Sequence, residues 1–309
     1  MEISLRLELK NHLSGLKKAA GCGRITKKDS EMRKLTLLIL LATFFHFLTG
    51  NKPTHVEQSV NVLEASLVSL AKTTGDKRNT SLTRVNFEEH ILNLYGEIRL
   101  QELTLDFEVF RMAMVGYYAL KKEGALSGKD LISIIDFARP STEKRFYTID
   151  LRNREVKYHT YVAHGRNTGQ NMATEFSNIP HSNQSSLGFY VTGETYVGSK
   201  GYSLRLDGME TSFNDKIRSR AVVMHAADYA TESWIKRYGR LGRSQGCPAL
   251  PPHLSREVID TIKGKTAIFT YYPDETYLSG SRYLQVEELF EKLDEKPIEL
   301  AIAQPMSQS

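Results

Sequence analysis

The most constraining feature of the sequence is a change of pattern at Gly128. Before it, from Phe87 to about Gly124, apolar residues recur at helical spacings of three to five residues. After it, they fall in short runs rich in β-branched and aromatic side chains, interrupted by turn-forming residues. These runs cover residues 131–137, 145–151, 155–163, 188–196, 202–206, 221–225 and 266–272, with one helical pattern at 253–263. We therefore predict a mostly β (α+β) domain of largely antiparallel strands, because the helices do not alternate with strands as βαβ units require.

The net positive charge of the chain comes from its first 50 residues. The whole chain has a formal net charge of +5, and residues 1–50 contain nine Lys or Arg against four Asp or Glu. The remaining residues carry equal numbers of both signs. A nucleic-acid-binding domain concentrates basic residues on its folded surface. We therefore expect no nucleic-acid partner.

Residues 32–50 have the composition of a secretory signal peptide. Met32 is followed by Arg33 and Lys34, then by fourteen mostly apolar residues, and the segment ends at Gly50. Fourteen helical residues rise about 21 Å, which is short of the roughly 30 Å hydrocarbon core. We expect export to the periplasm or cell envelope, with only transient membrane contact through this segment. A buried core helix is the alternative.

The rest of the chain divides by composition. Residues 1–31 precede the signal segment, and we interpret them as an over-called N-terminal extension. The mainly polar residues 51–85 predict a linker, residues 86–127 a helical segment, residues 128–283 the β domain and residues 284–309 a charged tail. The sequence has no clustered His, Cys, Asp and Glu spacing, so we expect no metal and no cofactor. It does not indicate an oligomeric state.

Cys247 is the one cysteine that remains if the leader is removed, because Cys22 lies in the N-terminal extension. An exported thiol without a partner is either buried filler or retained for its reactivity. Gly246 allows a sharp turn before Cys247, Arg243 adds positive charge nearby, and amide groups of such a turn can face an oxyanion. His225 ends an apolar strand, where an imidazole can act as a general base.

Six motifs stand in order along the β domain: residues 162–165 (VAHG), 176–178 (FSN), 185–190 (SSLGFY), 196–208 (YVGSKGYSLRLDG), 220–229 (RAVVMHAADY) and 239–250 (GRLGRSQGCPAL). Together they resemble the catalytic domain of the murein L,D-transpeptidases, the YkuD-type family, in the branch with a GRSxGCPA motif. The resemblance covers residues 131–277. It implies a β-sandwich-like catalytic domain at residues 128–283, preceded by the helical segment.

The resemblance also implies a chemistry. Cys247 would form a thioester with a peptidoglycan stem peptide, with His225 as the base. Ser244 would orient the imidazole or brace the loop, and the backbone N–H groups around Gly246 and Cys247 would stabilise the oxyanion. A neighbouring stem would then resolve the thioester into a 3→3 cross-link. Two positions depart from the wider family, since Gln245 replaces a usual histidine and Ala249 replaces a usual Arg or Asn.

Substrate contacts are predicted less directly. Arg243 could bind a substrate carboxylate in place of the residue lost at position 249, and His164, Tyr229 and Tyr190 could line the cleft. Structural or core positions are the alternative for the last three.

Other functions stay open on the sequence alone. Water in place of the acceptor amine would make the chain an L,D-carboxypeptidase. A sortase-like acyl transferase would need an arginine after the cysteine, whereas Arg243 precedes it. A non-catalytic wall-binding protein of the same fold would leave Cys247 inert toward alkylating reagents.

Overall fold

The computed structural model describes residues 78–286, which belong to the second of two compact units that divide at Gly75 and Asp76. The predicted N-terminal extension, the signal segment, residues 51–77 of the linker and residues 287–309 of the tail lie outside the described residues. None of the helices within residues 78–286 is both long and apolar enough to cross a membrane.

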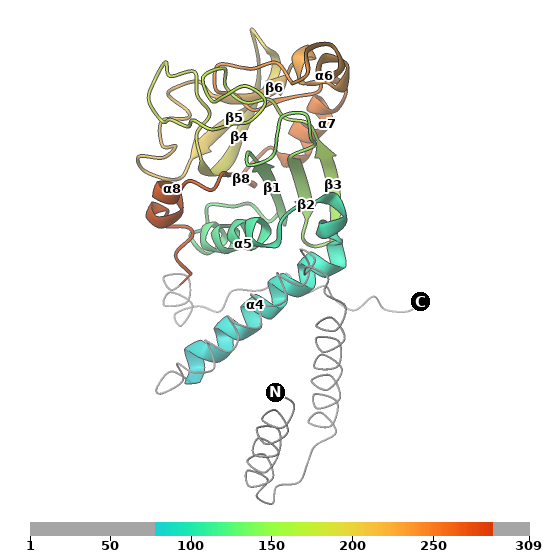
Figure 1. Ribbon diagram of the computed structural model, residues 1–309. Helices are drawn as coiled ribbons and strands as arrows, with labels where there is room; N and C mark the ends of the chain where they lie inside the picture. Colours follow the sequence, from blue (N-terminus) through green and yellow to red (C-terminus); the bar gives the residue numbers. More distant parts are fainter. Residues whose placement is uncertain (1–77, 287–309) are drawn as a thin grey trace, which may run out of the picture. The chain divides into compact units, whose positions relative to one another are not determined.

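The described part of the chain begins with helices, as predicted. Helix α4 (Arg78–Ile98) is followed by the short 3-10 helix η1 (Leu100–Leu103) and by α5 (Phe107–Lys122) (Figure 1). Residues 78–85, which we assigned to the linker, already form the first turns of α4. Extending an existing helix adds one hydrogen bond per residue and needs no apolar face, so polar residues can continue it.

Helix α5 has both terminal signals and a face that fits the sheet. The Asp106 side chain accepts a hydrogen bond from the Glu108 N–H at 2.8 Å, and Lys121 and Lys122 lie in the last turn, where the helix dipole favours cations. A Cβ atom at Gly116 would lie 2.0 Å from Cζ of Phe189. Glycine at this position therefore lets the helix backbone approach the Phe189 ring directly.

The strands form one eight-stranded sheet in the order β3-β2-β1-β8-β4-β5-β6-β7. Most neighbours are antiparallel, and only β1–β8 and β6–β7 are parallel. The mostly β prediction is confirmed. The bounds are β1 Leu131–Asp136, β2 Phe146–Asp150, β3 Glu155–Thr160, β4 Gly188–Gly198, β5 Gly201–Gly208, β6 Val223–Ala226, β7 Ala249–Leu250 and β8 Ala267–Tyr271.

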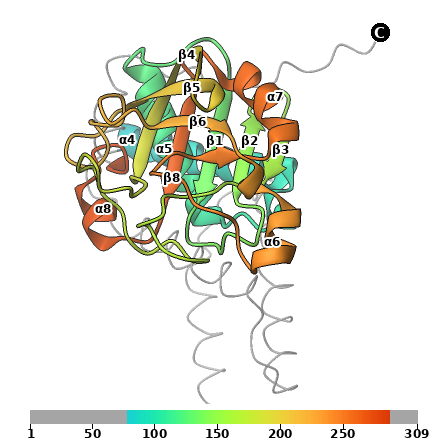
Figure 2. The same ribbon diagram turned by 90° about the horizontal axis from the view of Figure 1, so that it is seen from above.

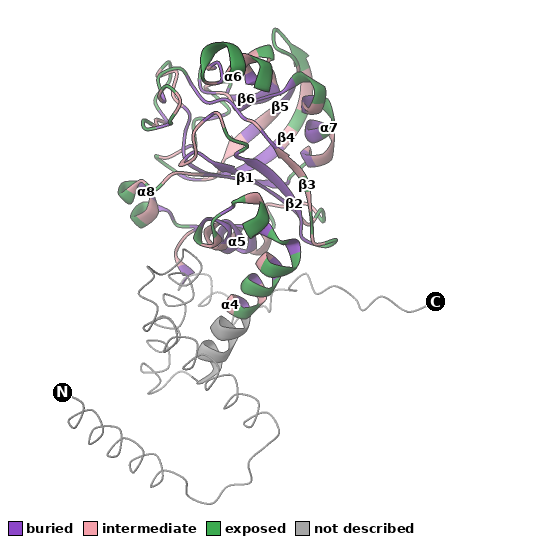
Figure 3. Cartoon of the chain, turned by 45° about the vertical axis from the view of Figure 1, so that its right-hand side comes forward, coloured by how far each residue is buried: buried purple, intermediate pink, exposed green. Residues whose placement is uncertain are grey.

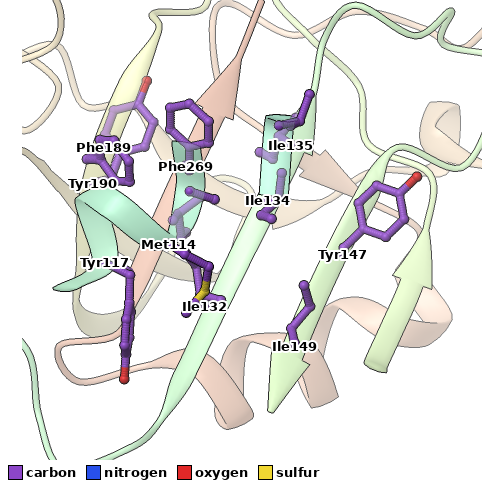
Figure 4. Packing of buried hydrophobic residues seen from close by; sticks show 14 of the residues in the cluster. Met114, Tyr117, Ile132, Ile134, Ile135, Tyr147, Ile149, Phe189, Tyr190 and Phe269 are labelled. Carbon is purple, nitrogen blue, oxygen red and sulfur yellow. The ribbon is translucent and has the colours of Figure 1, made fainter. Parts of the chain in front are cut away.

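The main core lies between α5 and the sheet. Figure 4 shows Met114 of α5 beside Ile132 of β1, and both belong to the main core. Phe189 stacks on Phe269 with ring centroids 4.5 Å apart. Burying each such side chain contributes about 1.5–3 kcal/mol. This packing makes the central strands a rigid base for the loops at their ends.

Helix α7 (Pro252–Ile262) also packs against the sheet, and Figure 2 shows it beside β3. Its buried residues Val258, Ile259 and Ile262 belong to the same core, and the helix contacts β5 and β6. The observed bounds differ by one residue from the predicted helix at 253–263. Because β6 carries His225, α7 fixes the strand from which that imidazole projects.

Four elements were not predicted, and one of them is the 3-10 helix η2 (Asp228–Ala230). Helix α6 (Glu232–Tyr238) has no buried residue, so its sequence has no apolar stripe to reveal it (Figure 3). Strand β7 has only two residues, and α8 (Glu275–Gly280) has six. Val286 is buried against the core, so the packed unit extends past the predicted boundary at residue 283.

Candidate active site

Cys247 lies on the loop that leads into β7, beside the first residue of β6. Its side chain is half-buried, and it is the free cysteine of the described residues. The backbone N–H of Val223 donates a hydrogen bond to Sγ at 3.4 Å. The parallel pairing of β6 with β7 sets His225 opposite Ala249, two residues after Cys247. The fold therefore places Cys247 on the loop before β7, the strand that pairs with the one carrying His225.

The His225 ring is held in one tautomer. It is only 2% exposed, and Nδ1 lies 2.8 Å from the backbone oxygen of Ala226. A carbonyl oxygen can only accept, so Nδ1 carries the proton and donates it. Nε2 is then left with a free lone pair in the neutral ring. Among residues 78–286, the ring bonds to the Ala226 oxygen and Sγ accepts from the Val223 N–H, and no hydrogen bond joins the ring to Sγ.

Burial keeps both groups neutral. It raises the pKa of the Cys247 thiol, and the Val223 N–H, Lys200 and Arg220 offset only part of this effect. Burial also lowers the pKa of His225, and the charge of Lys200 acts in the same direction. A neutral imidazole is the protonation state that a general base requires.

Ser244 and Gly246 shape the loop before the sulfur. The Ser244 hydroxyl donates to the Cys247 carbonyl oxygen at 2.7 Å and accepts from the Gly246 N–H at 3.0 Å. Gly246 has φ of 117°, and a Cβ there would lie 2.7 Å from the Gln184 oxygen. Only glycine fits this turn without strain. The Gly246 N–H, which we expected to face an oxyanion, is therefore engaged, whereas no hydrogen bond from the Cys247 N–H is present in residues 78–286.

The other sequence motifs brace this loop from behind. The Ser185 hydroxyl donates to the Gly246 oxygen at 3.2 Å and accepts from the Gly165 N–H at 3.1 Å. The Ser244 N–H donates to the backbone oxygen of His164 at 2.9 Å. The VAHG and SSLGFY segments thus hold the catalytic loop by short hydrogen bonds, which explains why they accompany the cysteine motif.

His164 was predicted as a substrate contact, and the structure gives it another position. It is 1% exposed, Nδ1 accepts from Nη2 of the buried Arg145 at 2.7 Å, and Nε2 faces the Gly169 oxygen at 3.4 Å. Burial, followed by the Arg145 charge, lowers the pKa of His164 to about 3. With both nitrogens occupied by the protein, the ring has none left for a ligand.

Tyr190 and Tyr229, which we predicted could both line the cleft, lie in different environments. Tyr190 is 4% exposed and donates its hydroxyl proton to the Ser186 oxygen at 2.6 Å, so it belongs to the core and does not line a cleft. Tyr229 is half-buried, and a Cβ on Gly242 would come within 2.3 Å of its Cβ. The phenol of Tyr229 interacts electrostatically with Cys247, which adds to the effect of burial and raises the pKa of Tyr229 to about 12. Of the two, Tyr229 borders the site.

The positive charge near the sulfur comes from residues that we did not single out. Arg243 donates from Nη1 to the carbonyl oxygens of Arg166 and Gly169, both at 3.0 Å, and so holds a neighbouring loop. The two cations that lower the Cys247 pKa are Arg220 and Lys200. Arg220 opens the 220–229 motif, and that place in the motif was the available signal. Lys200 lies in a glycine-flanked turn within the 196–208 motif.

Arg220 is a structural clamp. It donates from Nη1 to the Ser177 oxygen at 2.7 Å and to the Ser186 hydroxyl at 2.6 Å. From Nη2 it donates to the Ser182 hydroxyl at 3.2 Å and to the Gln184 oxygen at 2.7 Å. These bonds fix residues 177–186 against the turn at Gly246.

Within residues 78–286, no group of three or more His, Cys, Asp or Glu residues is placed to hold a metal ion.

Comparison with known proteins identifies the family of this chain. Residues 101–271, more than half of the chain, match the model of the L,D-transpeptidase catalytic domain family. Similar solved structures include an L,D-transpeptidase from Mycobacterium smegmatis, with 13% identity over 46% of this chain and 59% of that one and a TM-score of 0.29. L,D-transpeptidase 3 from Mycobacterium tuberculosis has 11% identity over 46% and 61%, with a TM-score of 0.31. LdtMt1 in complex with imipenem has 16% identity over 47% and 60%, with a TM-score of 0.29.

This chain thus matches less than two thirds of the length of those proteins. No curated protein sequence matches the chain. The match to the family model confirms the family prediction, while the GRSxGCPA branch stays a prediction. This chain belongs to the L,D-transpeptidase catalytic domain family, whose members are acyltransferases that modify the stem peptides of peptidoglycan.

Proposed function

We propose that the chain is an L,D-transpeptidase in which Cys247 is the nucleophile and His225 the general base. The observation that carries the proposal is the tautomer of His225. Its Nδ1 proton is held by the Ala226 oxygen, so Nε2 presents a lone pair on the strand adjacent to a half-buried sulfur. A buried histidine with a purely structural role would have both nitrogens engaged, as His164 has.

In the first half-reaction, the donor is a tetrapeptide stem. The Cys247 thiol gives its proton to Nε2 of His225 as Sγ bonds to the carbonyl carbon of the third residue. The Cys247 N–H, free of protein partners, would stabilise the oxyanion of the tetrahedral intermediate. The bond to the terminal D-Ala then breaks, and His225 returns the proton to the leaving amine. The product is a thioester on Cys247.

In the second half-reaction, the amine of a neighbouring stem attacks the thioester. His225 takes a proton from this amine, the carbon–sulfur bond breaks and the thiol is restored. The new amide is a 3→3 cross-link. With water as the acceptor, the same steps release a tripeptide, which is the carboxypeptidase reaction.

The remaining residues have supporting roles in this proposal. Ser244 and Gly246 hold the loop so that the Cys247 N–H stays free, and Tyr229 borders the donor site. Arg243 would act by fixing the 166–169 segment and not by binding a carboxylate directly. The proposed place of action is the cell envelope, reached through the signal segment at residues 32–50.

Purified chain incubated with tetrapeptide-stem muropeptides tests the proposal. We expect 3→3 linked dimers and released D-Ala, and neither product from Cys247→Ala. Tripeptides with no dimers would assign the carboxypeptidase reaction. The absence of all three products, from a wild-type chain whose fold is verified by circular dichroism, would favour the non-catalytic wall-binding alternative.

A further inference from the structure

The hydroxyl of Ser185 holds the carbonyl oxygen of the residue before the proposed nucleophile. Ser185 is 4% exposed, and its hydroxyl donates to the Gly246 oxygen at 3.2 Å. The same hydroxyl oxygen accepts from the Gly165 N–H at 3.1 Å, which leaves its proton for Gly246. The Ser185 N–H donates to Oγ1 of the buried Thr168 at 2.7 Å and so fixes the residue that carries the hydroxyl. The Gly246 carbonyl therefore has one direction, toward Ser185.

The direction of this carbonyl decides the direction of the Cys247 N–H, because both groups belong to one peptide unit. No peptide bond in residues 78–286 is cis. In a planar trans peptide the C=O and the N–H point in opposite directions. With the Gly246 oxygen turned toward Ser185, the Cys247 N–H points away from the buried segment behind the loop. It donates no hydrogen bond within residues 78–286, so it is available to an oxyanion.

This peptide unit depends on one side chain. Ser244 holds the unit before it through the Gly246 N–H and the unit after it through the Cys247 oxygen. The unit between them follows a glycine with φ of 117°, and a residue without Cβ restricts the rotation of the next peptide least. Within residues 78–286, the hydrogen bond to this middle unit comes from Ser185. A half-turn rotation would replace the N–H with the Gly246 oxygen, whose partial negative charge would oppose an oxyanion.

We propose that Ser185 is a positioning residue for the oxyanion donor, because its bond to the Gly246 oxygen keeps the Cys247 N–H facing the substrate carbonyl group. This inference deepens the proposed function and rests on it, since an oxyanion forms only if Cys247 attacks a carbonyl carbon. Ser185 acts through the backbone and not on the sulfur. Its effect is therefore confined to steps that pass through a tetrahedral intermediate.

Two reactions of the same sulfur separate this role from a general loosening of the loop. Formation of the Cys247 thioester from a tetrapeptide-stem donor builds charge on a carbonyl oxygen. Alkylation by iodoacetamide displaces iodide from a saturated carbon and builds no such charge. Both rates are measured by intact mass in rapidly quenched samples of wild type, Ser185→Ala and Ser186→Ala. Ser186 is the matched control, because its hydroxyl is also buried in this segment but makes no bond to the Gly246 peptide.

The expected result is a selective loss of acylation. Removal of one oxyanion donor costs about 10²–10³-fold in kcat, so we expect the acylation rate of Ser185→Ala to fall by about tenfold or more. Its alkylation rate should stay close to that of wild type. Ser186→Ala should keep the wild-type ratio of the two rates. Circular dichroism verifies the fold of each variant, and Ser185→Gly, which also lacks the hydroxyl, replaces the alanine variant if that one does not fold.

An equal loss of both rates in the Ser185 variant would overturn the proposal, because the sulfur itself would then have been disturbed. So would an unchanged acylation rate, or an equal fall of the ratio in Ser186→Ala. If wild type is alkylated but acquires no adduct from the donor, the proposed function itself fails. That result is distinct from an acylated wild type whose Ser185 variant keeps the same ratio.

Discussion

His164 and His225 are both buried, but their ring nitrogens have different hydrogen-bond partners. His225 lies within β6 and His164 follows the bridge residue Ala163, each is at most 2% exposed, and burial lowers the pKa of both. His164 has Arg145 on one nitrogen and a carbonyl oxygen on the other, whereas His225 has a carbonyl oxygen on Nδ1 only. Burial and a lowered pKa are therefore common to both histidines, and only the unoccupied Nε2 of His225 separates the proposed base from the structural His164.

Substituting glutamine for each of these two histidines tests the comparison, and it has the largest expected effect on activity. His225→Gln removes the base, and general-base catalysis contributes about 10²–10⁴-fold, so we expect kcat/KM for D-Ala release to fall by that factor. His164→Gln preserves an acceptor for Arg145 and a donor for the Gly169 oxygen, so activity should stay within about tenfold of wild type. Steady-state kinetics of both variants checks this. Comparable losses in the two variants would contradict the division of roles.

A substitution in the turn at Gly246 is expected to have the next largest effect on kcat/KM. Alanine there would be held at φ of 117°, with its Cβ 2.7 Å from the Gln184 oxygen, and such strain costs about 1–3 kcal/mol. We expect Gly246→Ala to move the loop and to reduce kcat/KM by roughly 10- to 100-fold. Gly239→Ala is the control, because Gly239 also has positive φ, 73°, but has open space at its Cβ. If both variants lose activity equally, the close contact at Gly246 has no special role.

The fall of kcat/KM at low pH should follow the protonation of His225. Its lowered pKa keeps the ring neutral down to pH values below the ordinary 6.5. We expect kcat/KM to be flat from pH 8 to 6.5 and to fall by up to tenfold per pH unit only at lower pH, as the base becomes protonated. Initial rates of D-Ala release from pH 4.5 to 8 measure this limb. A midpoint above 6.5 would show that the site does not lower the pKa of the ring.

His164 should affect stability and not rate. Its pKa is about 3 in the folded state and 6.5 when unfolded, so between these values the unfolded chain binds more protons. The contribution of His164 to stability is then complete above pH 6.5 and is lost as pH falls toward 3, by up to about 1.4 kcal/mol per unit. Urea unfolding at pH 7 and pH 5 should show a smaller acid loss for His164→Gln than for wild type. An identical pH dependence in both would place the titrating group elsewhere.

The sequence predicted what depends on local pattern and on shared motifs. The runs at 131–137 and 145–151 are continuous in β-branched and aromatic residues because both faces of β1 and β2 are buried, and both strands were predicted. The closeness of Cys247 to the strand of His225 was inferred from motif resemblance, since the β6–β7 pairing joins residues that are far apart in the chain.

The roles of individual side chains around the site depend on burial and hydrogen-bond geometry, which a local sequence pattern does not reveal. His164 and Tyr190 lie in motifs, but their side chains point into the protein. Arg243 lies only four residues before Cys247, yet its guanidinium donates to two loop carbonyl oxygens. Lys200, on the β4–β5 turn 47 residues before Cys247, lowers the pKa of the thiol. Electrostatic partners of this kind are set by strand register and cannot be read from spacing.

The central claim is that the sulfur of Cys247 carries the donor as a thioester. The most direct measurement is the intact mass of the chain after brief incubation with a tetrapeptide-stem donor, followed by peptide mapping. The account predicts an added mass equal to the donor minus D-Ala, located on the Cys247 peptide, released by hydroxylamine and absent from Cys247→Ala. D-Ala release without this adduct in rapidly quenched samples, together with an active Cys247→Ala variant, would contradict it.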